Sequence, residues 1–176
     1  MLENTTIMNV SQLKEISVTA IQLNPQNFNN EQVESAWLGN QPATKEAIKA
    51  AEQKLGMTLP EDYKAFLLIT NGFFTPTDST EPTFESVENI DYLKNVDYFL
   101  IEVWCVPELI DIGQQLEKSI IIGGLEDEQY FLLIPPADGN SEWKYWKFAS
   151  WIPGEQPYKN LNDYFTSILE FLKKEC

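Results

Sequence analysis

The stretch LGMTLPEDYKAFLLITNG, residues 55–72, contains the clearest structural signals in the sequence. Apolar residues recur with helical spacing from Ala47 to Leu55, and Thr44 is a suitable N-cap for the helix they define. Gly56 follows at the position where a left-handed helix end favours glycine. The pattern therefore predicts a helix that ends at this glycine.

A second helix is predicted after a short hinge. Pro60 is favoured at a first helical position, and Glu61 and Asp62 place negative charge at the positive end of the helix dipole. One face of this helix is expected to carry Tyr63, Phe66, Leu67 and Thr70. The pair Asn71-Gly72 then ends it, so the segment predicts two helices with a tight break between them.

These signals predict the backbone conformation of two glycines and the burial of four apolar side chains. Gly56 and Gly72 should occupy conformations that favour glycine. Four apolar side chains should be buried: Leu55, Leu59, Phe66 and Leu67. The segment displays no nucleophile and no acid–base pair, and its agreeing signals indicate architecture rather than chemistry.

Further along the chain the pattern changes to strands. Residues 119–122 and 130–134 are apolar on both alternating faces, as in central strands, and an acidic turn separates them. Residues 142–148 predict a third strand, in which Trp143 and Trp146 point to opposite faces. Since the two cannot both face the core, one of them could be a surface anchor, although core or edge packing is the stronger interpretation for each singly.

Three more elements complete the expected fold. Residues 98–103 are interpreted as a short strand, and Pro107 is expected to open a helix that reaches Leu116. Asn160 is expected to cap a final apolar-faced helix. Helices, then consecutive antiparallel strands, then a helix predict an α+β fold, an antiparallel β-sheet flanked by helices.

The first 36 residues have weaker signals. Residues 11–16 could begin a short helix, and residues 18–23 alternate as a strand does. Asn30 is a candidate cap for a short helix that carries Val33 and Trp37. We therefore expect a partly structured N-terminal extension over residues 1–36 and a domain over residues 37–176, compact overall as one domain.

Length and composition restrict the class of protein. A chain of 176 residues with 43% hydrophobic and 22% charged residues is typical of one folded domain. No apolar run is long enough to cross a bilayer, and the first ten residues lack the apolar core of a secretory signal. Cys105 and Cys176 have no metal-ligand spacing and are expected as free thiols, which favours a cytoplasmic location.

Two residue types are missing. The sequence has no histidine, and its twelve basic residues are all lysines. The chain thus lacks the commonest general base and metal ligand, and the bidentate fork that recognises phosphate or guanine. Its net charge of −15 would repel nucleic acid and anionic lipid and attract basic partners, although such acidity can also serve solubility alone. We expect no cofactor, no metal, no nucleic-acid partner and no membrane partner.

The order of these motifs resembles the SUKH superfamily. The first block of the resemblance consists of Glu52, Leu55, Gly56, Leu59, Pro60, Asp62, Tyr63, Lys64, Phe66, Leu67, Asn71 and Gly72. The second block consists of Ile120, Ile121, Ile122 and Gly123, and then Trp146, Phe148, Ala149, Trp151, Pro153, Gly154 and Tyr158. The likeness extends from about Trp37 to the end of the chain, and residues before Trp37 match no part of it.

The resemblance implies a binding protein. SUKH-like proteins include bacterial immunity proteins, which neutralise polymorphic or contact-dependent toxins, and a yeast regulator of cell-wall synthesis. The implied function is to bind and occlude a basic, nuclease-like toxin domain, and the alternative is a non-enzymatic regulatory scaffold of the cell-wall kind. A glycosidase built on paired carboxylates is a further class, but no acid lies in a recognisable motif and the family likeness implies no catalysis. We therefore expect that the protein is not an enzyme.

Acidic residues suggest where a partner would bind. The segment from Asp78 to Glu102 contains seven acids and one lysine, and the turn after residue 125 adds three more acids. The candidate partner-binding residues are Asp78, Glu81, Glu85, Glu88, Asp91, Glu102, Glu126, Asp127, Glu128 and Trp143. The competing interpretation is that these acids form only a solvated face.

Overall fold

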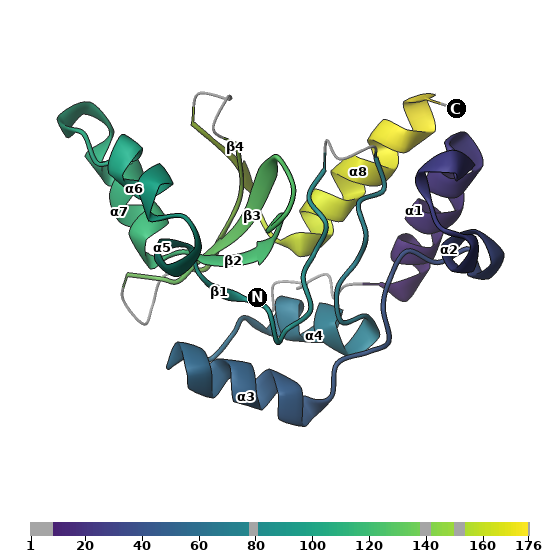
Figure 1. The fold of residues 1–176 in the computed structure, drawn as a ribbon, viewed down its shortest axis with the longest axis horizontal. Coiled ribbons are helices and arrows are strands. Elements are labelled where there is room, and N and C mark those ends of the chain that lie inside the picture. Colours follow the sequence, from purple (N-terminus) through teal and green to yellow (C-terminus); the bar gives the residue numbers. More distant parts are fainter. Residues whose placement is uncertain (1–8, 78–80, 138–141, 150–153, 176) are drawn as a thin grey trace, which may run out of the picture.

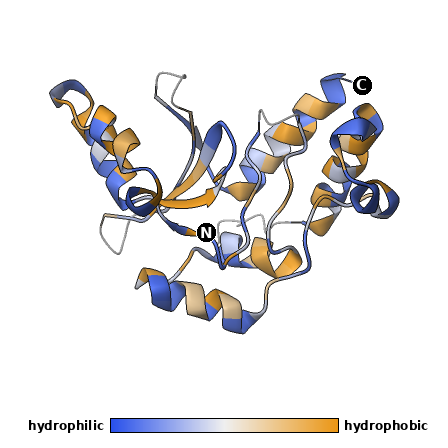
Figure 2. Cartoon of the chain, in the orientation of Figure 1, coloured by the Kyte–Doolittle hydropathy of each residue, from blue (hydrophilic) through white to orange (hydrophobic). Residues whose placement is uncertain are grey.

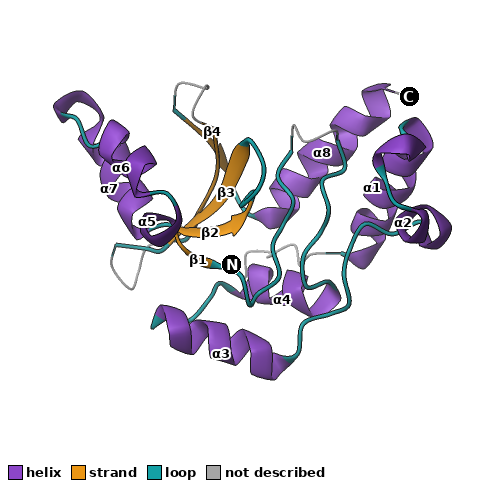
Figure 3. Ribbon diagram, viewed as in Figure 1, coloured by secondary structure: helices purple, strands orange, loops and turns teal. Residues whose placement is uncertain are grey.

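The computed structural model describes residues 9–77, 81–137, 142–149 and 154–175. The first part of the chain contains α1 (Val10–Leu23), η1 (Pro25–Asn27), α2 (Asn30–Ser35), α3 (Lys45–Leu55) and α4 (Glu61–Ile69). The middle contains β1 (Asp91–Tyr92), α5 (Leu93–Val96), α6 (Tyr98–Trp104), η2 (Pro107–Leu109) and α7 (Ile110–Lys118). The last part contains β2 (Ile120–Gly123), β3 (Gln129–Ile134), β4 (Lys144–Ala149), β5 (Glu155–Tyr158) and α8 (Leu161–Glu175). Figure 3 shows the resulting α+β fold.

The sheet is an antiparallel meander of five strands in the order β1-β2-β3-β4-β5. Its central pairings run through β2, β3 and β4, where Ile121 lies opposite Leu132 and Leu132 lies opposite Trp146. The predicted strands over residues 119–122, 130–134 and 142–148 are therefore confirmed, with small differences at their ends. Strands β1 and β5 were not predicted.

Helices cover both faces of the sheet (Figure 1). On one face, Ile120, Ile122 and Phe131 belong to a large core that also contains residues of α1, α3, α4 and α8. On the other face, Ile121 and Leu132 belong to a second core with α5, α6 and α7. Side chains alternate along each strand, so neighbouring residues face opposite cores, which explains why these strands carry apolar residues on both faces. Figure 2 shows this hydrophobic character along β2.

The opening segment folds as its cap signals predict. The Thr44 side chain accepts a hydrogen bond from the Ala47 N–H at 3.1 Å, and α3 ends at Gly56, which has a φ of 69°. Gly72 has a φ of 103°. The four side chains predicted to be buried are at most 5% exposed: Leu55, Leu59, Phe66 and Leu67.

The two ends of the described chain meet in the large core. The Asn160 side chain accepts a hydrogen bond from the Asp163 N–H at 2.8 Å and so caps α8, as predicted. Helix α1 lies beside α8, and Figure 1 shows the two helices together at one end of the molecule. Leu13 and Ile16 of α1 are fully buried there, and the Gln12 side chain donates a hydrogen bond to Thr166 Oγ1 at 2.9 Å. Residues 10–23 thus help to build the core.

Two strand predictions are wrong. Residues 18–23 belong to helix α1, and residues 98–103 belong to helix α6. In α1, burial of Leu13, Ile16 and Ala20 on one face stabilises the helix against the β-propensity of its valines and isoleucines. In α6, the Asp97 side chain accepts the Leu100 N–H at 3.0 Å and provides an N-cap that was not recognised. The short helix α2 does form, but its cap is Asn29 rather than Asn30.

The expectation that only one of the two tryptophans near β4 could face a core is also wrong. Trp146 is 6% exposed in the second core, and Trp143 is half-buried against the large core. Both tryptophans are packed because the sheet has a helical layer on each face. Side chains alternate between these faces along the strand, so each ring lies against a different core. Trp37 and Trp104 are half-buried at the rims of the two cores, and Trp151 lies outside the described residues.

Candidate partner-binding site

Polar residues of the motif over residues 52–72 connect secondary-structure elements through hydrogen bonds. Asp62 of α4 accepts hydrogen bonds from the Tyr145 hydroxyl and, at 3.3 Å, from the Leu161 N–H, so it links α4 to β4 and to the start of α8. Burial, followed by the charge and hydrogen bond of Asp62, raises the pKa of Tyr145, which therefore stays a protonated donor. These contacts give the Asp62 carboxylate a structural role, because it connects three elements of the fold.

Glu52 and Asn71 have similar structural roles. A Glu52 oxygen accepts the Leu59 N–H at 2.9 Å and so bridges the break between α3 and α4. The Asn71 side-chain oxygen accepts the Val87 N–H at 2.7 Å, and its amide donates to Glu88 at 2.9 Å. The motif thus holds the helical pair to the 84–90 segment.

Glu81, a candidate partner-binding residue, is engaged inside the protein. One carboxylate oxygen accepts a hydrogen bond from Lys147 Nζ at 2.8 Å, and the other accepts from the Tyr164 hydroxyl at 3.1 Å. The Glu81 side chain is 15% exposed and that of Lys147 is 9% exposed. With its oxygens directed inward, Glu81 is poorly placed to contact a partner.

The acids of the β2–β3 turn lie close to Glu85. Glu85 accepts the Leu125 N–H at 3.2 Å, and Asp127 accepts the Thr83 N–H at 2.6 Å, so these two acids hold the turn to the 83–85 segment. Burial, and then the nearby charges of Asp127 and Glu126, raise the pKa of Glu85, and its hydrogen bond from Leu125 opposes this rise. Glu126 and Glu128 are exposed beside this pair.

Two further candidates also have internal partners. Asp91 pairs with Lys54 at 3.0 Å and accepts hydrogen bonds from Asn95 and from the Tyr92 N–H. Desolvation alone would raise the pKa of Asp91, but these donors outweigh it and lower that pKa. Glu88 is exposed, and its hydrogen bond from Asn71 is the main cause that lowers its pKa.

The acids of the segment from Asp78 to Glu102 do not share one surface. Glu102 is exposed on α6, which belongs to the helical layer of the second core. The 83–85 segment lies beside the large core, which contains Phe84, whereas Leu125 of the β2–β3 turn packs against the second core. Asp78 lies outside the described residues. Among the candidate acids that the structure describes, the exposed ones are Glu88, Glu102, Glu126 and Glu128.

Sequence reasoning missed an apolar surface next to Glu102. Tyr98, Phe99 and Val103 of α6 are 57%, 74% and 50% exposed. Their exposure was not predicted because residues 98–103 were interpreted as a strand. The signal was present: the run YFLIEVW is apolar around nearly the whole helix, so it must expose some of those residues when the opposite face packs on the sheet.

Two general features bear on the kind of site. In the part of the chain that the structure describes, no three His, Cys, Asp or Glu side chains are arranged to hold a metal ion. Within the same residues, no helix has the length and hydropathy needed to cross a membrane.

The fold and these contacts define an α+β protein in which an antiparallel meander lies between two helical layers and the motif residues join the elements. The chain belongs to the SMI1 / KNR4 family (SUKH-1), whose family model matches residues 42–174. A comparison with curated proteins gives no match. The match confirms the resemblance seen in the sequence, and this family is consistent with an immunity protein or a regulatory scaffold.

Proposed function

We propose that this protein is an immunity protein that binds and neutralises a cognate, basic toxin domain without catalysing a reaction. Membership of the SUKH-1 family carries the proposal, because immunity proteins of toxin systems form a large part of the SUKH superfamily. The net charge of −15 supports a basic partner, since opposite fields accelerate association. Nuclease toxins are a suitable class because proteins that bind nucleic acid tend to be basic.

The contacts of the motif residues support a binding role over a catalytic one. Asp62, Glu52 and Glu81 accept hydrogen bonds that connect secondary-structure elements, so these carboxylates act as structural acceptors. A general acid or base must instead be free to exchange a proton with a substrate. Exposed acids remain at the β2–β3 turn and on α6, and they can attract a basic surface without any rearrangement of the fold.

The test starts from the genes next to this one: any toxin domain encoded there is assayed for binding to and inhibition by this protein, and the absence of such a domain would count against the proposal. The purified protein should form a stable complex with a catalytically inactivated form of that domain, and its expression should protect cells that make the active form. The association rate should fall steeply as salt is raised from 50 to 500 mM, as expected for electrostatic steering at Debye lengths of roughly 14 to 4 Å. A basic protein of unrelated fold serves as the control and should bind weakly or not at all.

Two results would contradict the proposal. Failure to bind the neighbouring toxin or to protect against it would favour the regulatory scaffold. Turnover of a glycan, peptide or nucleic acid that disappears on changing one carboxylate would favour an enzyme.

A further inference from the structure

The most exposed apolar surface of the described chain lies on the helical layer of the second core. Seven of the thirteen large hydrophobic residues exposed among the described residues lie between positions 96 and 110. We call them the α6 patch: Val96, Tyr98, Phe99, Val103, Val106, Leu109 and Ile110. Phe99 at 74% is the most exposed of all thirteen. Exposed apolar side chains concentrated in one segment of the chain are a feature of interaction sites in soluble proteins.

Helix geometry relates the members of the patch that lie on α6, and the others follow or precede them directly in the chain. Phe99 and Val103 are four residues apart on α6, which places their side chains on the same face. Val106 is three residues beyond Val103, and the Leu109 N–H donates to the Val106 carbonyl at 2.9 Å. The patch therefore continues from α6 through η2 to Ile110, the first residue of α7.

The patch is held on a rigid support. Leu100 and Ile101, on the opposite face of α6, are at most 6% exposed, and the Trp104 ring lies edge-on to Phe148 of β4 at 5.0 Å between centroids. Asp97 caps α6 and also accepts a hydrogen bond from the Tyr130 hydroxyl of β3 at 3.0 Å. Since these contacts already anchor α6, the exposed rings are free to contact another molecule without loss of the helix.

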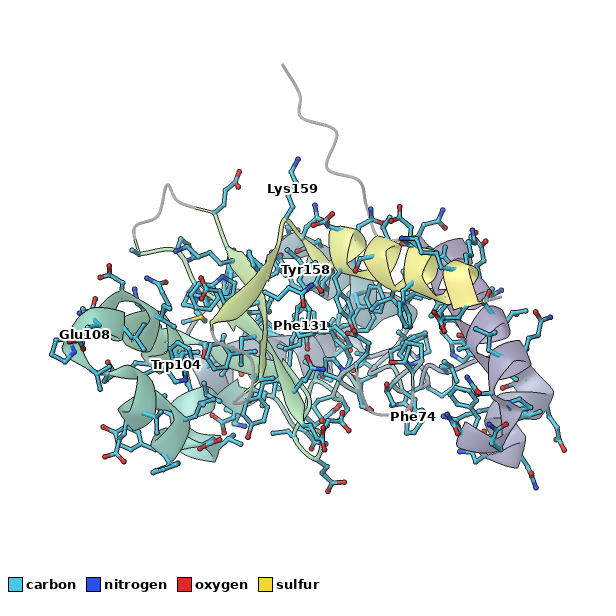
Figure 4. All side chains as sticks on the ribbon, turned by 90° about the horizontal axis from the view of Figure 1, so that it is seen from above. Phe74, Trp104, Glu108, Phe131, Tyr158 and Lys159 are labelled. Carbon is cyan, nitrogen blue, oxygen red and sulfur yellow. The ribbon has the colours of Figure 1, made fainter. Side chains whose placement is uncertain are left out.

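Exposed acidic residues are interspersed with the patch residues along the chain. Glu102, Glu108 and Asp111 are all exposed and alternate in sequence with its apolar members. Figure 4 shows Glu108 at the outer edge of this layer, with Trp104 nearer the sheet. Between residues 93 and 118 there are five acids and two lysines, so the layer is negative overall by three charges. An apolar centre with a charged rim is the composition of a protein–protein interface.

We propose that the α6 patch is the docking surface for the basic partner, whose apolar side chains would cover Phe99 and Val103 while its lysines or arginines contact Glu102, Glu108 and Asp111. This inference rests on the proposed function, which supplies a basic partner. A second copy of this chain is disfavoured because a two-fold contact would bring these acids against their own copies. An anionic membrane is disfavoured because the same acids would face its negative surface.

The experiment measures binding of the inactivated neighbouring toxin domain to three pairs of variants. Phe99→Ala is compared with Phe171→Ala, which removes a phenylalanine that is 50% exposed on α8. Val103→Ala is compared with Leu68→Ala, at a residue that is 44% exposed on α4. Glu102→Lys with Glu108→Lys is compared with the same charge reversal at Glu126 and Glu128. Thermal melting of each variant checks that the fold is retained.

The proposal expects a specific pattern. Phe99→Ala should raise Kd by about 30-fold or more through faster dissociation, as for an aromatic hot spot, and Phe171→Ala should change it less than about threefold. Val103→Ala should weaken binding more than Leu68→Ala does. Reversal at Glu102 and Glu108 should slow association and reduce its salt dependence more than reversal at Glu126 and Glu128.

The outcomes separate this inference from the proposed function. If the wild-type protein binds the toxin and Phe99→Ala binds it equally well, the α6 patch is not the docking surface and the immunity function stands. If the wild-type protein does not bind the toxin, both proposals fall. If sedimentation shows a dimer that Phe99→Ala dissociates, the patch joins two copies of this chain and the inference is overturned. Binding to anionic vesicles that Phe99→Ala abolishes would overturn it as well.

Discussion

Lys147 Nζ of β4 lies 2.8 Å from a carboxylate oxygen of Glu81, and the contact joins the centre of the sheet to the segment that precedes Phe84. Both side chains are largely buried, so each charge depends on the other for compensation. Tyr164 of α8 completes the cluster through its hydroxyl, and burial followed by the charge of Glu81 raises the pKa of that hydroxyl. An acid that the sequence suggested for partner binding thus connects a strand, a helix and a loop.

The first prediction concerns this cluster. Glu81→Gln should lower the free energy of unfolding by about 2–4 kcal/mol, because it leaves the Lys147 ammonium buried without a counter-charge. Glu128→Gln, at an exposed acid, is the control and should change it by less than about 0.5 kcal/mol. Urea unfolding measures both. Adding Lys147→Met to Glu81→Gln should recover part of the loss, and equal stabilities for the two single variants would show that the pair is not structural.

The second prediction concerns the apolar centre of the large core. Phe66 is fully buried, with the rings of Phe84 and Phe165 at centroid distances of 5.4 and 5.6 Å. Phe66→Ala should cost about 3–5 kcal/mol, since the aromatic neighbours can fill the cavity only in part. Leu68→Ala on the exposed face of the same helix should cost less than about 1 kcal/mol. Calorimetric melting distinguishes them, and a small effect at Phe66 would mean that this core can repack.

The third prediction compares two glycines of positive φ. A Cβ on Gly72 would lie 2.9 Å from the Phe84 carbonyl oxygen, which itself accepts the Phe73 N–H at 3.1 Å. A Cβ on Gly56 would meet nothing within 4 Å. Gly72→Ala should therefore cost roughly 2–4 kcal/mol through backbone strain and displacement of Phe84, and Gly56→Ala only about 1–2 kcal/mol through strain alone. Equal losses in denaturant titrations would contradict this distinction.

The fourth prediction concerns pH. Burial raises the pKa of Glu85 in the folded protein above the 4.5 of a free side chain, so the folded state holds this proton more tightly than the unfolded state. The resulting stabilisation is complete below pH 4.5 and is lost as the pH rises through the folded pKa. Glu85→Gln keeps an acceptor for Leu125 and removes the charge, so its stability relative to wild type should increase between pH 4 and pH 7.

Urea midpoints at these two pH values measure that difference. Glu128→Gln is the matched control, because Glu128 is an exposed acid of the turn that Glu85 contacts. A relative stability that falls for Glu85→Gln as the pH rises would show that the ionised carboxylate stabilises the fold. The same substitution should leave α6 and its patch unchanged.

Helices whose start and end signals are both present in the sequence were predictable. Thr44, Gly56 and Pro60 each favour one backbone conformation through short-range contacts, so local sequence alone is enough to place the helical pair. The strands β2, β3 and β4 were predictable because buried strands are apolar on both faces. Helix α6 was not, because a short apolar run has no periodicity that separates a strand from a helix.

By itself the sequence determined the class of fold, the family and the acidic character of the protein, since helix caps, strand hydrophobicity and net charge depend on residues close together or on composition alone. Only the tertiary structure decided which acids are available to a partner. Glu81, Glu85 and Asp127 find donors in Lys147, Leu125 and Thr83, which are 40 or more residues away along the chain. The second helical layer likewise decided that Trp143 and Trp146 are both packed and that Phe99 is exposed, because burial depends on what covers a surface and no local pattern records it.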